Sequence, residues 1–386
     1  MNKIKIVHIL HSFDVGGIET LVLNLCNMMD KSKYEFHLIT LTSDKLRMVQ
    51  QLSEDVEIHS LPFNHQELKT IKGLLNAFYQ LVKLLKIINT DIIHSHLTSL
   101  PLLFISTAIK YANVTSVHIR TLHTAGLFYE NQNGLSNKRK LFAEKIAMRL
   151  VKTHLISVSN TVYRNNFFHF KDIAENITLI QNGIDLNKFN KNLYKHLTKQ
   201  NFGIQEDNVL ISYIARLDEG KNHDFLIEIW KDVLVKCPNV VLCFAGDGVY
   251  KERLQEKAKQ MDLMNHIIFL GAINNVPELL SVSNFAVFPS SYEGFGLVMI
   301  EKFAMGLPII ASDIKSFQDI ATNNENAFLV DITNKKDFIN RILDLCLNPI
   351  LRKKMGEKAF STAKQYSIGY TLDLYDQYYT SCLNKK

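Results

Sequence analysis

Short apolar runs alternate with longer helical patterns along the whole 386-residue chain. Each run is apolar on both faces, as expected of strands in a parallel sheet that helices cover on both sides. In the first half we predict strands at residues 3–10, 35–41, 91–96, 116–123 and 154–159. In the second half we predict strands at residues 209–216, 240–246, 266–271, 285–290 and 308–312. The alternation predicts an α/β fold built from βαβ units.

The chain is longer than one hydrophobic core usually supports, so we expect two domains. The periodicity lapses at residues 179–192, "LIQNGIDLNKFNKN", where Asn182-Gly183 is a turn signal. We therefore predict a first domain at 1–180 and a second at 181–365. The tyrosine-rich segment 366–386 is predicted to be helical. Its sequence is compatible with a helix that completes the second domain and with one that crosses back to the first.

The overall composition is that of a globular protein, with 47% hydrophobic and 21% charged residues. A net charge of +6 is too modest for this length to indicate nucleic-acid binding. The five cysteines have no paired spacing, which favours buried thiols in a reducing compartment over disulfides or a zinc site. The longest uncharged stretch, 97–109, is too short to cross a bilayer, and no signal-peptide cleavage site follows the first strand. We expect a cytoplasmic protein without a transmembrane helix.

Gly16 and Gly17, in "HSFDVGGIETLVLNL", follow the first predicted strand and precede a helical pattern. Glycines at such a turn let a ligand approach the backbone, and the N–H groups at a helix start attract phosphate. The motif is not G-x-G-x-x-G, so a dehydrogenase is disfavoured. A purely structural turn is the alternative.

Arg216 ends a predicted strand of the second domain, and Lys221 follows five residues later, before a helix. Both cations are expected at the carboxyl edge of the sheet, where open α/β sheets bind ligands. Two cations at that edge suit a diphosphate, and solvated surface charge is the alternative.

Glu293 and Glu301 lie in "SSYEGFGLVMIEKFAMGLPIIASD", residues 290–313. The pattern predicts a strand, a loop that carries Glu293, and a helix with Glu301 about two turns from its start. A carboxylate can accept two hydrogen bonds from neighbouring hydroxyls such as those of a ribose or a hexose. Gly294 and Gly296 leave the loop backbone free to donate N–H groups to a phosphate. A loop salt bridge and a surface charge are the alternative for the two acids.

Several histidines stand at the predicted strand ends of the first domain. "DIIHSH" carries His94 and His96, and "VHIRTLHTAG" carries Arg120 and His123. His96 and Arg120 are candidates for an acceptor site, and hydrogen-bonded loop residues are the alternative. No histidine, cysteine or acid spacing indicates a metal site.

Taken together, the chain resembles the retaining glycosyltransferases of family 4. The similarity runs from "DVGGIET" through "DIIHSH", "NGID" and "ARLDEGKN" to the Glu-x7-Glu stretch, and so covers most of the chain. The resemblance implies the GT-B fold, with two facing Rossmann-like domains and an interdomain cleft. The first domain would bind the acceptor, and the second would bind the nucleotide-sugar.

The resemblance also implies roles for the candidate residues. Glu301 would hold the ribose of the donor, Glu293 the transferred sugar, and Arg216 with Lys221 the diphosphate. The donor-site backbone would include Gly294, Phe295, Gly296 and Leu297. His123 matches the position of a histidine that faces the donor sugar. Lys302 stands where many members carry alanine, and we expect it to point into solvent.

The implied reaction moves a sugar from a nucleotide-diphosphate-sugar, with UDP as the expected nucleotide, to an acceptor hydroxyl with retention. No cofactor or metal is expected, because the two cations and the helix start supply the positive charge. Two alternatives are a nucleotide-sugar 2-epimerase of similar fold and a non-catalytic nucleotide-sugar-binding protein. The family implies a role in cell-surface polysaccharide or glycolipid synthesis, with a saccharide or lipid-linked saccharide as acceptor.

The segment 137–154 has six basic residues and one acid, Glu144, for a net charge of +5. It is predicted to be an amphipathic helix. The predicted apolar stripe comprises Leu141, Phe142, Ile146, Leu150 and Val151. The upstream stretch 68–86 also combines lysines with apolar residues. We expect peripheral binding to the anionic inner face of the cell membrane, and packing of the stripe on the first domain's sheet is the alternative.

Overall fold

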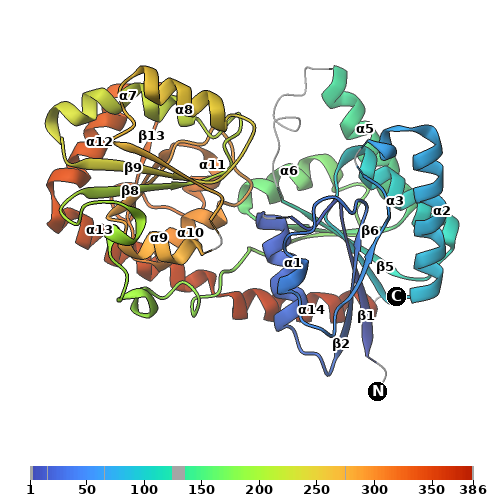
Figure 1. Cartoon of the computed structure of the whole chain (residues 1–386). Coiled ribbons are helices and arrows are strands. Elements are labelled where there is room, and N and C mark those ends of the chain that lie inside the picture. The colour runs from blue at the N-terminus through green and yellow to red at the C-terminus, as the bar shows by residue number, and fades with distance from the viewer. Residues whose placement is uncertain (1–2, 15, 65, 124–134, 274, 385–386) are drawn as a thin grey trace. The chain divides into compact units, whose positions relative to one another are not determined.

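The computed structural model describes residues 3–14, 16–64, 66–123, 135–273 and 275–384. The chain divides into two compact units (Figure 1). Unit 1 comprises Met1–Gly183 and Ile368–Lys386, and unit 2 comprises Ile184–Ser367. The observed division after Gly183 lies close to the boundary predicted from the Asn182-Gly183 turn.

Unit 1 contains a seven-stranded sheet in the order β3-β2-β1-β4-β5-β6-β7, in which every neighbouring pair is parallel. Its strands are β1 (Ile4–Leu10), β2 (Tyr34–Thr40), β3 (Glu57–Ser60), β4 (Ile92–Ser95), β5 (Val117–Leu122), β6 (Thr153–Ser157) and β7 (Asn176–Leu179). Its helices include α1 (Gly17–Met28), α2 (Ile71–Ile88), α3 (Ser99–Ala112), α5 (Leu135–Leu150), α6 (Asn160–Phe170) and α14 (Ile368–Asn384).

Helices cover both faces of this sheet because successive strand residues point to opposite sides. In β1, Ile6 packs in a buried cluster with residues of α1 and α14. The next residue, Val7, packs in a second cluster with residues of α2 and α3. This double cover explains why the strands are apolar on both faces.

Unit 2 contains a six-stranded parallel sheet in the order β10-β9-β8-β11-β12-β13. Its strands are β8 (Val209–Ile214), β9 (Val240–Ala245), β10 (Ile267–Gly271), β11 (Phe285–Phe288), β12 (Ile309–Ser312) and β13 (Ala327–Val330). Its helices include α7 (His223–Lys236), α8 (Lys251–Gln260), α9 (Val276–Val282), α10 (Leu297–Ala304), α11 (Lys315–Gln318), α12 (Lys335–Leu347) and α13 (Pro349–Ala363). The α/β prediction is confirmed in both units.

The C-terminal helix α14 belongs to unit 1, which decides between the two alternatives for segment 366–386. Asp376 accepts hydrogen bonds from the Lys33 ammonium at 2.7 Å and the Tyr34 hydroxyl at 2.8 Å. The Thr371 hydroxyl donates to the Gln181 carbonyl oxygen at 3.0 Å. Figure 1 shows α14 in red beside α1. The end of the chain therefore completes one covered face of the first sheet.

No helix among the described residues combines the length and the apolar character that crossing a membrane requires. All five cysteines lie in described positions and are buried thiols, as predicted. Desolvation raises the pKa of Cys26 and of Cys243 to about 12, so both are protonated at neutral pH.

Candidate functional site

Two loops of unit 2 leave the same edge of its sheet. The strands β8 and β11 are parallel neighbours, so the segments 215–222 and 289–296 that follow them start side by side. The Asn222 amide donates to the Pro289 carbonyl oxygen and to Ser291 Oγ, both at 2.7 Å. The Ser291 N–H donates to the Gly220 carbonyl oxygen at 2.8 Å. These bonds hold the two predicted motifs together.

Gly220 is required where the two loops meet. Its φ of +81° is in the left-handed region, and a Cβ atom there would overlap the ring of Tyr292. A larger residue at position 220 would therefore strain the backbone and displace the Tyr292 ring.

Lys221 and Glu293 form an ion pair across these loops. The two side chains are only 18% and 17% exposed. The Tyr213 hydroxyl donates to the Lys221 carbonyl oxygen at 2.5 Å, which holds the lysine backbone against the sheet. The structure thus brings together a cation and an acid that the sequence placed on separate motifs.

Arg216 follows β8 at the same sheet edge, but its environment differs from that of Lys221. Its side chain is 75% exposed, and its Nε lies 3.2 Å from Asp218 Oδ2. Its guanidinium is accessible to a ligand at the edge, so its predicted role in diphosphate binding stays a prediction.

The backbone between Glu293 and α10 forms a tight turn. Gly294, Phe295 and Gly296 are buried, and Gly296 has a φ of +82° immediately before the helix. A Cβ atom on Gly296 would lie 3.2 Å from the Phe317 ring. Leu297 is the first residue of α10, so the start of this helix lies at the carboxyl end of β11. This is the arrangement in which helix N–H groups bind anions.

Glu301 is the fifth residue of α10, closer to the helix start than the predicted two turns. Burial raises the pKa of its carboxyl, while the charges of Lys302 and Lys188 lower it. The influence of Lys188 was not predicted, because it precedes α10 by more than a hundred residues and has no motif of its own. A partly exposed acid near cations can accept hydrogen bonds from a hydroxyl-rich ligand.

The prediction that Lys302 points into solvent is wrong. Its side chain is fully buried, its Nζ lies 4.8 Å from the Phe288 ring centroid, and it donates to the Val298 carbonyl oxygen at 3.4 Å. Burial lowers its pKa. Lys302 is therefore a buried amine that packs against Phe288 of β11, the strand that precedes the loop with Glu293.

In unit 1, Gly16 and Gly17 stand at the junction of β1 and α1. Gly16 precedes α1 with an extended backbone, and its carbonyl oxygen accepts from the Thr20 N–H at 2.9 Å and the Thr20 hydroxyl at 2.8 Å. Glu19 lies in the first turn of the helix. A donor contact at these glycines stays a prediction.

Arg120 has a buried acidic partner. The side chain is fully buried, and its Nη2 lies 3.0 Å from Glu144 Oε2. Its Nε donates to the Leu97 carbonyl oxygen at 3.0 Å, and Glu144 accepts from the Ser99 N–H at 2.8 Å. Arg120 thus ties β5 to α5 and to the segment after β4. This burial favours a structural role over the predicted contact with the acceptor.

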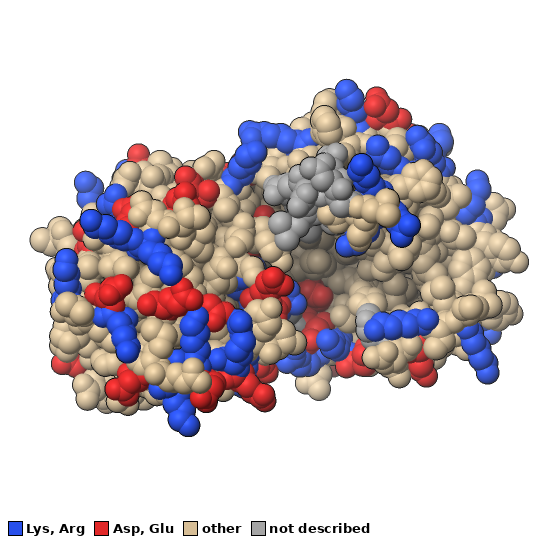
Figure 2. Space-filling view, turned by 90° about the horizontal axis from the view of Figure 1, so that it is seen from above, with Lys and Arg blue, Asp and Glu red and all other residues tan. Residues whose placement is uncertain are grey.

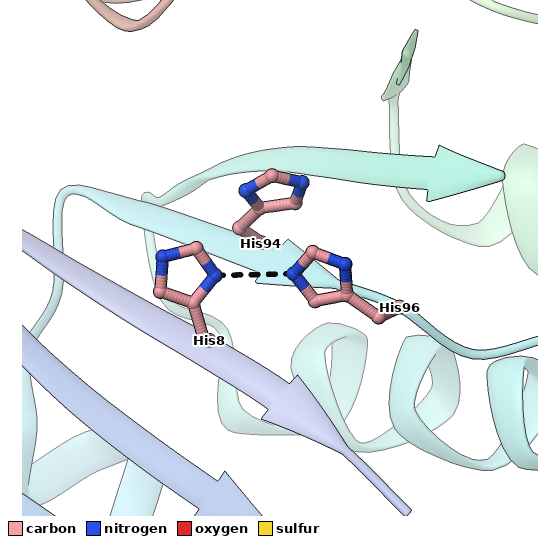
Figure 3. A group of neighbouring side chains, drawn as sticks. All are labelled: His8, His94 and His96. Atoms are coloured by element: carbon pink, nitrogen blue, oxygen red, sulfur yellow. Dashed lines mark hydrogen bonds between the residues drawn. The ribbon is translucent and has the colours of Figure 1, made fainter. Parts of the chain in front are cut away.

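Three histidines come together near the ends of β1 and β4. His8 and His94 are register partners in the paired strands, and His96 follows β4 (Figure 3). Ring nitrogens of His8, His94 and His96 lie within 4.8 Å of one another. Sequence spacing could not reveal this group, because His8 is 86 residues from His94.

The cluster is held together by hydrogen bonds. Both His94 nitrogens bond hydroxyls, Nδ1 that of Tyr379 at 2.8 Å and Nε2 that of Thr121 at 2.7 Å. His8 Nδ1 and His96 Nε2 lie 3.1 Å apart and face each other. His96 Nδ1 lies 3.0 Å from Nε2 of His123, the next residue after β5. Five of the six ring nitrogens of His8, His94 and His96 therefore take part in hydrogen bonds, and a metal ion bound here would have to displace some of them.

Two glycosyltransferase family profiles match most of the chain. The profile of "Glycosyltransferase Family 4" matches residues 15–188 and that of "Glycosyl transferases group 1" matches residues 195–362. The chain belongs to glycosyltransferase family 4. The predicted family is confirmed.

This family 4 glycosyltransferase is similar over most of its length to two named bacterial glycosyltransferases. It is 26% identical to the UDP-Gal:alpha-D-GlcNAc-diphosphoundecaprenol alpha-1,3-galactosyltransferase of Escherichia coli over 91% of this chain and 90% of that protein. It is 25% identical to the capsular polysaccharide biosynthesis glycosyltransferase CapH of Staphylococcus aureus over 98% of this chain and 99% of that protein.

A solved structure agrees in fold. The Anabaena protein HepE, crystallised in complex with UDP and glucose, matches with a TM-score of 0.80 and 19% identity over 98% of this chain and 100% of that one. At this identity the likeness shows the fold alone, and it agrees with the predicted GT-B architecture of two Rossmann-like domains.

The predicted apolar stripe on the glycosyltransferase's basic helix is confirmed only in part: Leu141, Ile146, Leu150 and Val151 are partly buried, and Val151 packs against the cluster formed with α2 and α3. In α5 the buried face comprises Ala143, Glu144, Ala147 and Met148. Phe142, which was assigned to the stripe, is 64% exposed. The buried face of the helix is therefore rotated from the predicted stripe, and Glu144, an acid counted among the surface charges, is in fact buried against Arg120. The helix surface is consequently more basic than its composition indicates.

Proposed function

We propose that this glycosyltransferase transfers a sugar from a UDP-sugar to a hydroxyl of a saccharide or lipid-linked saccharide with retention, in the synthesis of cell-surface polysaccharide or glycolipid. The observation that carries the proposal is the Lys221–Glu293 pair beside the start of α10. The names of the Escherichia coli and Staphylococcus aureus relatives support the substrate class. The complex of HepE with UDP and glucose supports the nucleotide.

The donor is assigned to the carboxyl edge of the unit 2 sheet. Glu301 accepts hydrogen bonds from the ribose, and Glu293 accepts them from the transferred sugar. The diphosphate binds Lys221, Arg216 and the backbone N–H groups at the start of α10. An ammonium has three donors, so Lys221 can bind a phosphate oxygen while it keeps its bond to Glu293.

In the reaction, the bond between the sugar's anomeric carbon and the diphosphate oxygen breaks. The acceptor oxygen forms its bond to that carbon on the same face, and the acceptor proton passes to the leaving diphosphate. Negative charge grows on the diphosphate as the bond breaks, so the charges of Lys221 and Arg216 stabilise the transition state more than the ground state. The proposed mechanism needs no metal ion.

We also propose that the glycosyltransferase binds reversibly to an anionic membrane surface on the cytoplasmic side. The support lies on unit 1, where α5 exposes basic residues and Phe142. The neighbouring helices α2 and α3 lie on the same face of the sheet as α5, and α2 exposes Ile71, Leu75 and Tyr79. Figure 2 shows Lys and Arg side chains gathered beside the grey, undescribed residues. Basic and apolar groups together suit a lipid interface.

A nucleotide-sugar panel tests the function. The matching donor should raise the unfolding temperature, since a ligand at a hundred times its dissociation constant adds about 2.7 kcal/mol of stability. Transfer to an acceptor should follow, with retained anomeric configuration by NMR. Conversion of the donor to an isomer without any acceptor would instead show an epimerase, and binding without turnover would show a non-catalytic protein.

A further inference from the structure

A continuous chain of hydrogen bonds joins three histidines of unit 1. His8 Nδ1 lies 3.1 Å from His96 Nε2, and His96 Nδ1 lies 3.0 Å from His123 Nε2. The first pair has ring centroids 5.4 Å apart and planes at 27°, and the second 5.2 Å and 35°. With these nitrogen–nitrogen distances, such centroid separations are those of tilted rings that meet edge to edge, as Figure 3 shows for His8 and His96. Both contacts therefore have good hydrogen-bond geometry.

The three rings are neutral at ordinary pH. Desolvation lowers the pKa of His8 to about 3 and that of His123 to about 3, and it holds the pKa of His96 well below its usual range. A neutral imidazole carries one N–H and one lone pair. Each link needs one donor and one acceptor, so the tautomer of one ring dictates those of the other two.

Only two arrangements of protons satisfy both links. In one, every ring carries its proton on Nδ1, so that His8 donates to His96 and His96 donates to His123. In the other, every ring carries its proton on Nε2 and the donors point the opposite way. The two differ at the ends of the chain, at His8 Nε2 and at His123 Nδ1.

The end at His8 selects between them. His8 is fully buried, and its Nε2 has no hydrogen-bond partner among the described residues. The Nε2 arrangement would bury an N–H group without an acceptor, and buried N–H groups without partners are rarer in proteins than under-satisfied acceptors. The Nδ1 arrangement leaves only a lone pair there.

We propose that His8 and His96 are positioning residues that hold His123 in its Nδ1–H tautomer, so that His123, which follows β5, offers a hydrogen-bond donor to a substrate oxygen at the carboxyl edge of the unit 1 sheet. His123 Nε2 is already engaged by His96, which leaves Nδ1 as the ring nitrogen for a ligand. The binding of a substrate at this edge rests on the proposed function, whereas the tautomer rests on the histidine chain alone.

Histidine side-chain NMR tests the tautomer directly. Long-range ¹H–¹⁵N spectra of the full chain labelled with ¹⁵N-histidine, at neutral pH, distinguish protonated from unprotonated ring nitrogens. We expect Nδ1–H for His8, His96 and His123, each assigned by the signal lost in its own variant. Nε2–H at His123 in the wild type overturns the proposal.

Two variants at position 8 separate a positioning effect from a structural one. His8→Asn keeps an amide donor near the place of Nδ1, so His123 should stay Nδ1–H with turnover near the wild-type rate. His8→Leu removes the donor, so His123 should show both tautomers and kcat should fall about tenfold, as one lost hydrogen bond allows. The matched control is His59→Asn, at the partly exposed sheet edge in β3, which should change neither readout.

A folded His8→Leu protein with pure Nδ1–H at His123 and full turnover overturns the proposal. Equal loss of activity in His8→Asn and His8→Leu, with the His123 tautomer unchanged in both, also overturns it. If the wild type transfers no sugar from any nucleotide-sugar, the proposed function fails, and the NMR result still decides whether the histidine chain sets the tautomer.

Discussion

Lys221 and Glu293 are 72 residues apart in the sequence and form an ion pair with less than one-fifth of either side chain exposed. The pair joins the loop after β8 to the loop after β11. Because water is largely excluded around it, its charges act more strongly on a bound diphosphate than surface charges would. The predictions begin with this pair.

Lys221→Ala should lower kcat by about a hundredfold, because it removes charge that stabilises the leaving diphosphate. Arg216→Ala should act in the same direction. Binding of the uridine nucleoside, which has no phosphate, should change little in either variant. Steady-state kinetics and calorimetry measure the two effects.

Lys231→Ala, an exposed lysine on α7, is the control and should keep wild-type kinetics. Activity should also be indifferent to EDTA. Activity that disappears with EDTA and returns with magnesium or manganese would show that the metal-free mechanism is wrong.

Glu301→Ala should weaken binding of the nucleotide-sugar by roughly ten to a hundredfold, because charged hydrogen bonds to a ligand are worth about 1.5–3 kcal/mol. The fold should be retained, as judged by circular dichroism. Glu325→Ala, an exposed acid of the same unit, should bind the donor normally. Donor binding that is unchanged in a folded Glu301→Ala protein would remove Glu301 from the site.

Arg120→Met should reduce the free energy of unfolding of unit 1 by about 3–5 kcal/mol, because it breaks the fully buried ion pair with Glu144. Denaturant unfolding of the full chain measures this. Lys152→Met is the control, since Lys152 is 87% exposed and lies 3.8 Å from Glu175, and should change stability by less than about 0.5 kcal/mol.

The double variant Arg120→Met with Glu144→Leu should recover part of the loss, because no unpaired buried charge remains. A single Arg120→Met variant as stable as the wild type would contradict the buried ion pair.

Lys302→Met should change how stability depends on pH. Burial lowers the pKa of Lys302 in the folded state below the ordinary value of 10.5, so in the window between the two values the unfolded state binds more protons. Wild-type stability should therefore rise with pH across that window. Removing the amine should stabilise the protein at low pH, and the gain should shrink as pH rises.

Denaturant unfolding at about pH 6 and about pH 9 measures this difference. Lys315→Met, an exposed lysine, is the control and should show the same small change at both pH values. A gain for Lys302→Met that grows with pH would have the wrong sign for a lowered pKa.

The protein should co-sediment with anionic liposomes, less so with added salt, and not with neutral ones. Changing Lys138, Arg139 and Lys140 to Gln should weaken this binding by about 3 kcal/mol, since each basic residue near the surface contributes about 1 kcal/mol. The control changes Lys353, Lys354 and Lys358, exposed residues of α13 in unit 2, to Gln. If both triple variants bind as the wild type does, or if the wild type ignores anionic liposomes at low salt, the membrane proposal fails.

All ten predicted strands are present, and the three that were not predicted, β3, β7 and β13, lie at sheet edges. Each of the three has only four residues. In β3, "EIHS" is partly exposed, and in β7, "NITL" is partly exposed throughout. The strands β3 and β7 thus lack the apolar run that marks a central strand, whereas β13 is apolar and mostly buried but only four residues long.

The meeting of Lys221 with Glu293 was partly foreseeable, because carboxyl ends of parallel strands share one sheet edge. The burial of Lys302 was not foreseeable. Helical periodicity gives the position of Lys302 on α10 but does not show which other elements pack over its side chain. The rotation of α5 was also not foreseeable. It depends on Arg120 of β5, a residue outside the helix whose charge requires a buried partner.

The sequence by itself determined the α/β class, the central strands, the division near Gly183 and the residues at the strand ends, because these follow from local periodicity and turn chemistry. Only the tertiary structure decided which buried polar groups meet. His8, His96 and His123 form one chain because β1, β4 and β5 are neighbours in the sheet. The order of the strands brings residues that are distant in the sequence to hydrogen-bond distance, and the low dielectric of the interior strengthens each of these hydrogen bonds. The number of residues between two histidines in the sequence predicts neither their contact nor its strength.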